Sequence, residues 1–155
     1  MRLLVIAEHD HRLLSEATRR AVTAALQIGP AVDVLVAGSQ CQPIVEQIAA
    51  LQGVAQVRVA DAAHYAIPMT EDMADLIVVQ SAGYSHVLAA ASSFGKRVLP
   101  RVAALLDVEQ ISEVCGVLSP DTFVRPIHAG NALATVRASE AVNVLTIRAS
   151  AFAPA

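Results

Sequence analysis

Charged side chains are scarce in this sequence. Aspartate, glutamate, lysine and arginine make up 16% of its residues, whereas a typical globular domain carries about 25%. Hydrophobic residues make up 55%, so part of the surface has to be apolar. Two interpretations fit this balance: a small alanine-rich domain, or a domain that buries one face against a partner.

Aromatic residues, cysteines and long apolar runs are also few. An aromatic content of 3%, a net charge of −3 and a pI near 5.9 argue against a nucleic-acid surface, which needs basic stripes and stacking rings. Cys41 and Cys115 belong to no C-x-x-C pair, so neither a disulfide framework nor a zinc site is predicted. The apolar stretch at 3–7 is too short for a signal peptide, and no later run reaches membrane length. We therefore expect a soluble, cytoplasmic chain without membrane insertion.

The 155 residues are close to the usual size of one domain. Over the first two-thirds, short β-branched runs alternate with segments of helical period, which is typical of βαβ crossovers and a buried parallel sheet. Strands are expected at 3–7, 32–36, 57–60 and 85–90. Helices are expected at about 14–28, 43–51, from Thr70 onward, and at 94–106, the last capped by Ser93 and interrupted by Pro100.

The pattern changes after Asp107. Four strand-like runs, 111–118, 122–127, 132–136 and 142–148, are separated by turn residues and leave no room for a helix. An antiparallel extension on the edge of the parallel sheet is the simplest arrangement. The predicted fold is therefore α/β and three-layered: a mostly parallel sheet flanked by helices, with a C-terminal antiparallel strand extension, nucleotide-binding-like. Residues 1–149 form the predicted domain and 150–155 the start of a linker.

Glycine is absent where a nucleotide site would need it. The turn after the first strand reads Glu8-His9-Asp10-His11-Arg12, while a dinucleotide-binding turn requires glycines there, and no P-loop run occurs elsewhere. Nucleotide binding by this chain alone is therefore a minority interpretation. The same turn offers imidazoles and a carboxylate, but consecutive loop residues rarely converge on one ion without a further ligand. A solvated loop is favoured, and no metal site is predicted.

A partial nucleophile motif surrounds Ser85. The second glycine of G-x-S-x-G is missing, and the serine precedes a strand instead of following one. Serine hydrolase chemistry therefore ranks last, and no catalytic residue is predicted.

Polar and basic side chains gather in the segments that follow Ala90. Ser92 and Ser93 follow the fourth strand, at the end of a sheet where α/β proteins place functional residues. One interpretation is helix capping plus solvated charges. The favoured one is a polar seam at a subunit or domain boundary, with Arg101 and Arg125 as planar anchors for carboxylates or carbonyls. The predicted seam consists of Ser93, Phe94, Lys96, Arg97, Arg101, Gln110, Ser112, Arg125 and Asn131.

Several segments carry a family resemblance. They read Ser-Phe-Gly-Lys at 93–96, Leu-Pro-Arg-Val-Ala-Ala at 99–104, Gln-Ile-Ser-Glu at 110–113, Ser-Pro-Asp-Thr-Phe-Val-Arg-Pro-Ile at 119–127 and Ala-Gly-Asn-Ala at 129–132. In this order, and together with the opening from Leu4, they resemble the electron transfer flavoprotein alpha subunit over essentially the whole chain. Arg97 and His128 depart from the family, where asparagine and tyrosine are common.

The resemblance implies the amino-terminal domain of a two-domain alpha subunit. In such proteins the second domain carries most FAD contacts, and a partner beta subunit holds AMP in many members. The complete heterodimer carries electrons from acyl-CoA and related dehydrogenases, as in fatty-acid oxidation, to a quinone reductase. The flavin-binding motifs of the family belong to the second half, so no residue here is expected to bind the cofactor.

The resulting expectation is a non-catalytic scaffold of an electron carrier, which binds the beta subunit and its own C-terminal FAD domain. The alternatives are a free-standing nucleotide-binding or stress-type α/β module and, last, a small hydrolase.

Overall fold

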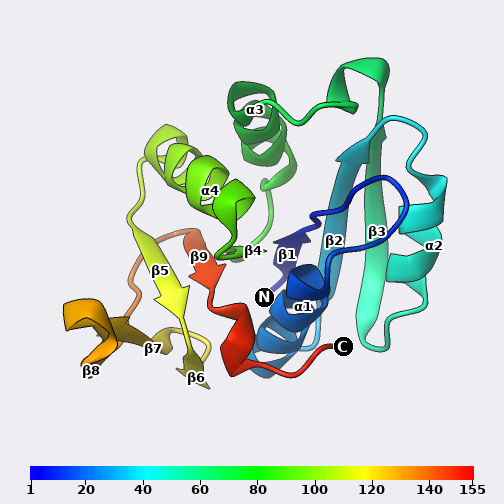
Figure 1. The fold of residues 1–155 in the computed structure, drawn as a ribbon. Helices are drawn as coiled ribbons and strands as arrows, with labels where there is room; N and C mark the ends of the chain where they lie inside the picture. Colours follow the sequence, from blue (N-terminus) through cyan, green and yellow to red (C-terminus); the bar gives the residue numbers. More distant parts are fainter.

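The computed structural model describes residues 1–155 and contains two sheets (Figure 1). A six-stranded sheet has the order β3-β2-β1-β4-β9-β5, and a separate three-stranded sheet has the order β6-β7-β8. All pairs in the larger sheet are parallel, and those in the smaller one are antiparallel. The strands of the larger sheet are β1 (Leu3–Ile6), β2 (Val32–Gly38), β3 (Val54–Asp61), β4 (His86–Ala90), β5 (Gln110–Val114) and β9 (Asn143–Ile147). Those of the smaller are β6 (Gly116–Ser119), β7 (Thr122–Ile127) and β8 (Ala132–Arg137).

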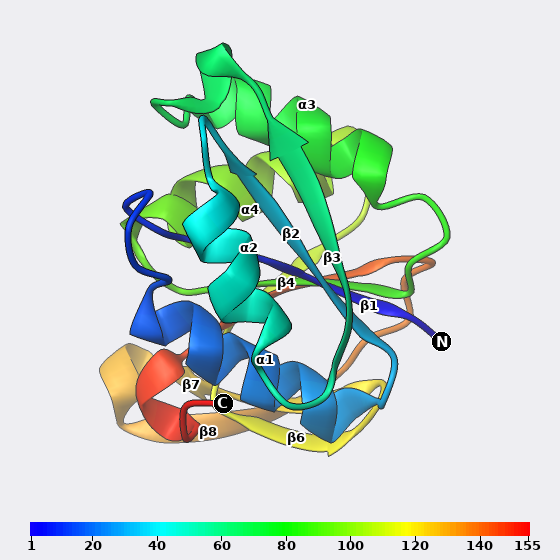
Figure 2. The same ribbon diagram turned by 90° about the vertical axis from the view of Figure 1, so that its right-hand side faces the viewer.

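Four α-helices cover the larger sheet: α1 (Glu16–Ile28), α2 (Gln42–Ala49), α3 (Thr70–Gln80) and α4 (Ser93–Leu106). Short 3₁₀ turns lie at Ala63–Tyr65, His128–Gly130 and Ala149–Ala151. Helices α1 and α2 lie on one face and α3 and α4 on the other (Figure 2). Because the larger sheet lies between two layers of helices, the molecule has the three layers that the sequence predicts. The smaller sheet packs beside α1.

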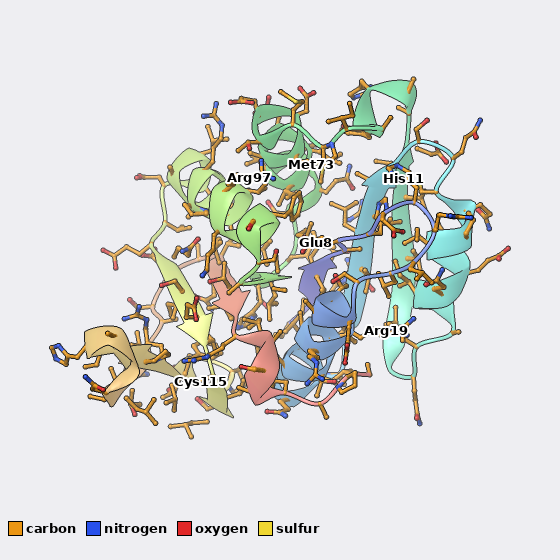
Figure 3. All side chains as sticks on the ribbon, viewed as in Figure 1. Glu8, His11, Arg19, Met73, Arg97 and Cys115 are labelled. Atoms are coloured by element: carbon orange, nitrogen blue, oxygen red, sulfur yellow. The ribbon has the colours of Figure 1, made fainter.

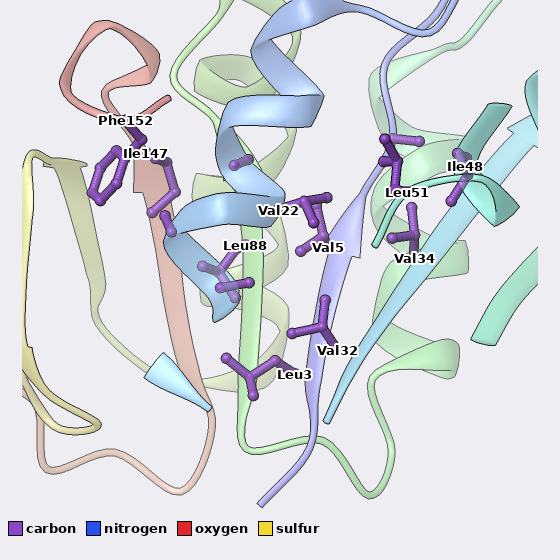
Figure 4. Packing of buried hydrophobic residues seen from close by; sticks show 14 of the residues in the cluster. Leu3, Val5, Val22, Val32, Val34, Ile48, Leu51, Leu88, Ile147 and Phe152 are labelled. Carbon is purple, nitrogen blue, oxygen red and sulfur yellow. The ribbon is translucent and has the colours of Figure 1, made fainter. Parts of the chain in front are cut away.

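Alternation along each strand builds the two cores. Leu3 and Val5 of β1 point into the core beneath α1 and α2 (Figure 4), whereas Leu4 and Ile6 point toward α3 and α4. All four side chains are buried because β1 lies in the interior of the sheet with helices on both faces. Continuous apolar runs of this kind are what made the parallel sheet predictable.

The predicted helices are present, with small differences at their ends. Pro43 lies in the first turn of α2, where its missing N–H costs nothing, and Pro100 lies inside α4. Ser92, one residue before the predicted Ser93, caps α4, because its hydroxyl accepts the Gly95 N–H at 3.2 Å. Thr70 begins α3 without capping it, and its hydroxyl instead accepts a bond from Arg97 at 3.2 Å.

The arrangement after Asp107 differs from the prediction in two ways. The run 111–118 is divided between β5 of the parallel sheet and β6 of the smaller sheet. The run 142–148 is not antiparallel: β9 inserts between β4 and β5 and is parallel to both. The hairpins of the smaller sheet therefore serve as the crossover that usually contains a helix. Buried Val144, Leu145 and Ile147 fill both faces, which explains why β9 belongs in the interior.

His86 connects the two sheets. It is 3% exposed, and its Nε2 lies 2.7 Å from the carbonyl oxygen of Pro120 in the β6–β7 turn. Its Nδ1 lies 2.7 Å from the Ser85 hydroxyl. Since the carbonyl can only accept, Nε2 carries the proton in the neutral ring and Nδ1 is an acceptor. The single proton of the Ser85 hydroxyl has two acceptors within reach, Nδ1 of His86 and the Arg2 carbonyl oxygen at 3.0 Å.

The last residues pack against α1. Phe152 is buried in the core beneath α1, and its carbonyl oxygen accepts a bond from Arg20 at 2.7 Å. The assignment of residues 150–155 to a linker stays a prediction. No helix has the length and apolar character that a membrane span requires.

Candidate functional site

The order of the parallel strands creates a crevice between β1 and β4. The chain runs outward from β1 to β2 and β3 and then returns to place β4 on the other side. In open α/β sheets, ligands bind outside the carboxyl ends of the strands at such a switch point. Glu8 follows β1 and Ser92 follows β4, so both lie at this edge. Figure 3 shows Glu8 on the side of the molecule where Met73 of α3 and Arg97 of α4 lie.

Glu8 occupies the place that an anionic ligand would take. The Ser92 hydroxyl donates to Oε2 of Glu8 at 2.6 Å while it caps α4. The carboxylate therefore lies beside the positive end of the α4 dipole, where nucleotide-binding proteins hold a phosphate. Sequence reasoning missed this pair, because only the strand order brings residues 8 and 92 together.

The remaining space in the crevice is small. A cavity of about 40 Å³ lies beside Glu8, lined chiefly by Ala7, His9, Tyr65, Met73 and Phe94. Small-molecule sites usually measure about 300–1,000 Å³, so this one has room for a few water molecules and not for an adenine or flavin ring. The residues present at the switch point do not fit FAD or AMP.

The histidines of the loop after β1 bond to backbone groups. Nε2 of His9 lies 2.7 Å from the Ala37 carbonyl oxygen, and its Nδ1 accepts the His11 N–H at 3.0 Å. Nε2 of His11 accepts the Ser39 N–H at 3.1 Å. These contacts fasten the loop to the end of β2, and no group of three or more potential metal ligands forms in the structure.

The buried His86 and the half-buried His9 are expected to make the chain less stable in mild acid. Desolvation lowers the pKa of His9 and of His86 in the folded state, whereas unfolded histidine titrates near about 6.5. The unfolded chain therefore binds more protons below that pH, and the free energy of unfolding decreases as the pH falls. We expect the melting temperature to decrease between about pH 7 and pH 5. His86→Gln, which keeps a donor for Pro120, should have a lower melting temperature at neutral pH but a flatter pH dependence. An unchanged pH dependence in that variant would assign the acid sensitivity to other groups.

Ser85 and His86 do not form a hydrolytic pair. The imidazole meets the hydroxyl through Nδ1, no carboxylate orients it, and the pair lies at the amino end of β4. A catalytic serine requires an oriented base and an exposed crevice.

The structure places the predicted seam in several parts. Lys96 of α4 forms an ion pair with Glu113 of β5, with Nζ and Oε1 2.9 Å apart. Arg125 of β7 donates through Nε and Nη2 to the carbonyl and hydroxyl oxygens of Ser112, at 3.0 and 3.2 Å. Helix α4 and strands β5 and β7 therefore bring Lys96, Ser112 and Arg125 to one side of the molecule.

The other seam residues lie apart from this group. Arg97 bonds to Ser93 and Thr70 at the α3–α4 contact, and the exposed Arg101 makes no ion pair. Phe94 is 8% exposed and packs inside the core. Gln110 lies at the amino end of β5, and its buried Oε1 has no hydrogen-bond partner. Asn131 is exposed and directly precedes β8.

A cleft of about 290 Å³ opens beside Arg125. We call it the Arg125 cleft; its lining residues are Glu113, Arg125, Pro126, Ala129, Gly130 and Arg148. Arg148 was not predicted as a site residue, because its position next to Arg125 depends on the insertion of β9 beside β5. Of the predicted seam residues, only Arg125 lines this cleft.

The low content of charged residues is reflected in large apolar side chains that are exposed at the surface. Ile67, Val79, Leu118 and Leu133 are each more than 60% exposed. They lie on different elements, so the structure contains several small apolar areas, of which Leu118 and Leu133 share the smaller sheet.

Comparisons with known proteins give one consistent result. The family model described as "Electron transfer flavoprotein domain" matches residues 3–155. The chain is 53% identical over 152 residues to the electron transfer flavoprotein subunit alpha of Pseudomonas aeruginosa, covering 98% of this chain and 49% of that protein. It is 48% identical to the subunit alpha of Bradyrhizobium diazoefficiens, covering 100% and 49%. It is 43% identical to the mitochondrial subunit alpha of Dictyostelium discoideum, covering 96% and 44%.

The chain thus spans about half the length of the curated relatives that it matches. The match runs through the strands of both sheets and includes every residue of the Arg125 cleft. The resemblance inferred from the segments between residues 93 and 132 is confirmed, and the chain belongs to the electron transfer flavoprotein family, with alpha subunits as its relatives.

Proposed function

We propose that this chain is the amino-terminal scaffold and partner-binding domain of an electron transfer flavoprotein alpha subunit. It would brace a C-terminal FAD domain and bind a beta subunit, which in turn holds AMP. The complete heterodimer would carry electrons from acyl-CoA and related dehydrogenases to a quinone reductase. The domain itself would be non-catalytic.

The family match carries this proposal. The geometry of the switch point supports a domain that binds partners while the cofactor is bound elsewhere. Glu8 lies at the positive end of α4, and the adjacent cavity measures about 40 Å³. A flavin would supply the redox chemistry wherever it is bound. The residues described above would position the domains and hold no reacting group.

The same observations weigh against a free-standing nucleotide-binding module. Such a module needs backbone N–H groups free to meet a phosphate at a helix N-terminus. Here the Ser92 hydroxyl accepts the Gly95 N–H and donates to a carboxylate. A phosphate at this position would have to displace Glu8 and overcome its charge.

The test is assembly of a full-length alpha subunit that carries Arg125→Ala. Removing an arginine anchor from a desolvated interface typically costs about 2 kcal/mol or more, which is roughly thirtyfold in affinity. We expect weaker assembly with the beta subunit, or weaker docking of the FAD domain, from a domain that stays folded by circular dichroism. Sedimentation and flavin content measure the two effects.

Arg12→Ala is the matched control, because Arg12 is exposed on the loop after β1 and forms no ion pair. Unchanged assembly and flavin content in Arg125→Ala would make Arg125 a solvated charge and remove it from the interface. Unfolding of the domain would assign it to the architecture instead.

A further inference from the structure

The Arg125 cleft has an excess of positive charge that the chain itself does not balance. Ion pairs form at Arg2, Arg20, Lys96 and Arg137. Neither Arg125 nor Arg148 has a carboxylate within ion-pair distance, although the chain carries more acidic than basic residues. Glu113 lines the same cleft, but its charge is already paired with Lys96 at 2.9 Å.

The side chain of Arg125 is fixed in position but has unused hydrogen-bond donors. Two of its five N–H donors bond to Ser112, which fixes the plane of the guanidinium. The other donors have no partner in the chain, and the residue is half-buried. A partly buried cation without a counter-ion is unfavourable, so an incoming oxyanion would gain a preorganised, charge-assisted contact.

The chemistry of the cleft favours a carboxylate over a phosphate. Phosphate sites usually add backbone N–H groups from a glycine-rich turn or a helix N-terminus, and no α-helix begins among the lining residues. Glu113, one of the lining residues, would repel a dianion more strongly than a singly charged carboxylate. An arginine fork matches the planar geometry of a carboxylate.

The surroundings are those of a protein interface. Pro126 lines the cleft and pairs in register with Leu133 of β8, which is 67% exposed. Leu118 of β6 is 64% exposed on the same small sheet. Arginine anchors beside apolar side chains are typical of protein interfaces. A site for a free small ion would not need the apolar side chains.

We propose that the Arg125 cleft binds an aspartate or glutamate side chain of a partner protein, with Arg125 and Arg148 sharing its charge. This inference rests on the proposed role as a partner-binding domain and names the chemistry of the contact. We take this partner to be the beta subunit.

Carbodiimide cross-linking can test the contact, because Lys96 is the only lysine among residues 1–155 and a second one can be placed at position 148. The reagent joins an amine to a touching carboxylate as an amide, and it takes up the water that is lost. In a full-length alpha subunit with Arg148→Lys, assembled with the beta subunit, we expect a new cross-link from position 148 to an aspartate or glutamate of the partner. The Lys96–Glu113 pair serves as an internal positive control, and Arg12→Lys is the matched negative control.

Two further measurements complete the test. Arg148→Ala should weaken assembly by roughly tenfold and reduce its sensitivity to salt, because a charge contact is lost. Assembly without a cross-link at position 148 and without an effect of Arg148→Ala would overturn the inference while leaving the proposed function standing. Failure of the unmodified subunits to assemble would instead overturn the proposed function. Stabilisation of the chain by inorganic phosphate, lost in Arg148→Ala, would assign the cleft to a phosphate ligand and contradict the carboxylate.

Discussion

Gly95→Ala is expected to lower the free energy of unfolding by about 3 kcal/mol or more. Gly95 lies in the first turn of α4, and a Cβ there would overlap the carbonyl oxygen of Ala90 at the end of β4. A backbone oxygen in a central strand cannot rotate away as a side chain can, so the helix itself would have to move. The melting temperature should fall by roughly 6–12 °C.

The displacement should also separate Ser92 from Glu8, because Gly95 donates to Ser92 in the same turn. Gly29→Ala is the control: its new Cβ would meet the flexible end of the exposed Met1 side chain, which can move, and a Leu3 methyl at 3.2 Å, which has to give by only a few tenths of an ångström. Thermal unfolding of both variants measures the difference. Equal melting temperatures would mean that α4 does not approach β4 as closely as described.

Phe123→Ala should cost about 3–5 kcal/mol, the usual loss for a buried phenylalanine. Phe123 of β7 is fully buried in the core beneath α1, in a cluster that includes Val114, Ile147 and Phe152. It is the largest side chain that the smaller sheet contributes to this core. Its removal should therefore loosen the smaller sheet more than the parallel one.

Hydrogen exchange distinguishes that outcome from general destabilisation. Amides of β6, β7 and β8 should lose protection before those of β1, β2 and β4. Leu133→Ala, on the same sheet but 67% exposed, should change stability by no more than about 0.5 kcal/mol. Equal losses in the two variants would show that the smaller sheet does not dock through Phe123.

The first two-thirds of the fold was predictable because the local signals agree. Continuous apolar runs such as 3–7 are typical of strands with helices on both faces, and each is followed by a segment of helical period. The errors there concern the ends of elements, as with the cap at Ser92 in place of Ser93. Neighbouring serines offer similar capping chemistry, so sequence alone does not separate them.

The position of β9 was not predictable in the same way. Its pairing with β4 joins residues more than fifty positions apart, and turn residues between short runs suggest hairpins first. Composition does not separate the two segments, because 142–147 and 132–137 each contain four apolar residues of six; in the structure, however, 144–147 is buried throughout, whereas 132–137 alternates between half-buried and exposed residues. The first pattern indicates an interior strand and the second a strand with one face in solvent.

The residues of the candidate site were likewise predictable in part. Lys96, Ser112 and Arg125 were predicted as one seam from their segments, and the structure brings them together across α4, β5 and β7. Arg148 was missed because its place follows from β9. The interface role of the whole set stays a prediction.

Native mass spectrometry of the purified chain, first alone with added FAD and AMP and then mixed with the beta subunit, tests the central claim most directly. The claim is that this domain binds a partner and no nucleotide of its own. We expect the unliganded mass in the first measurement and a one-to-one complex in the second. A chain that retains FAD or AMP when alone, or that forms no complex with the beta subunit, would contradict the account.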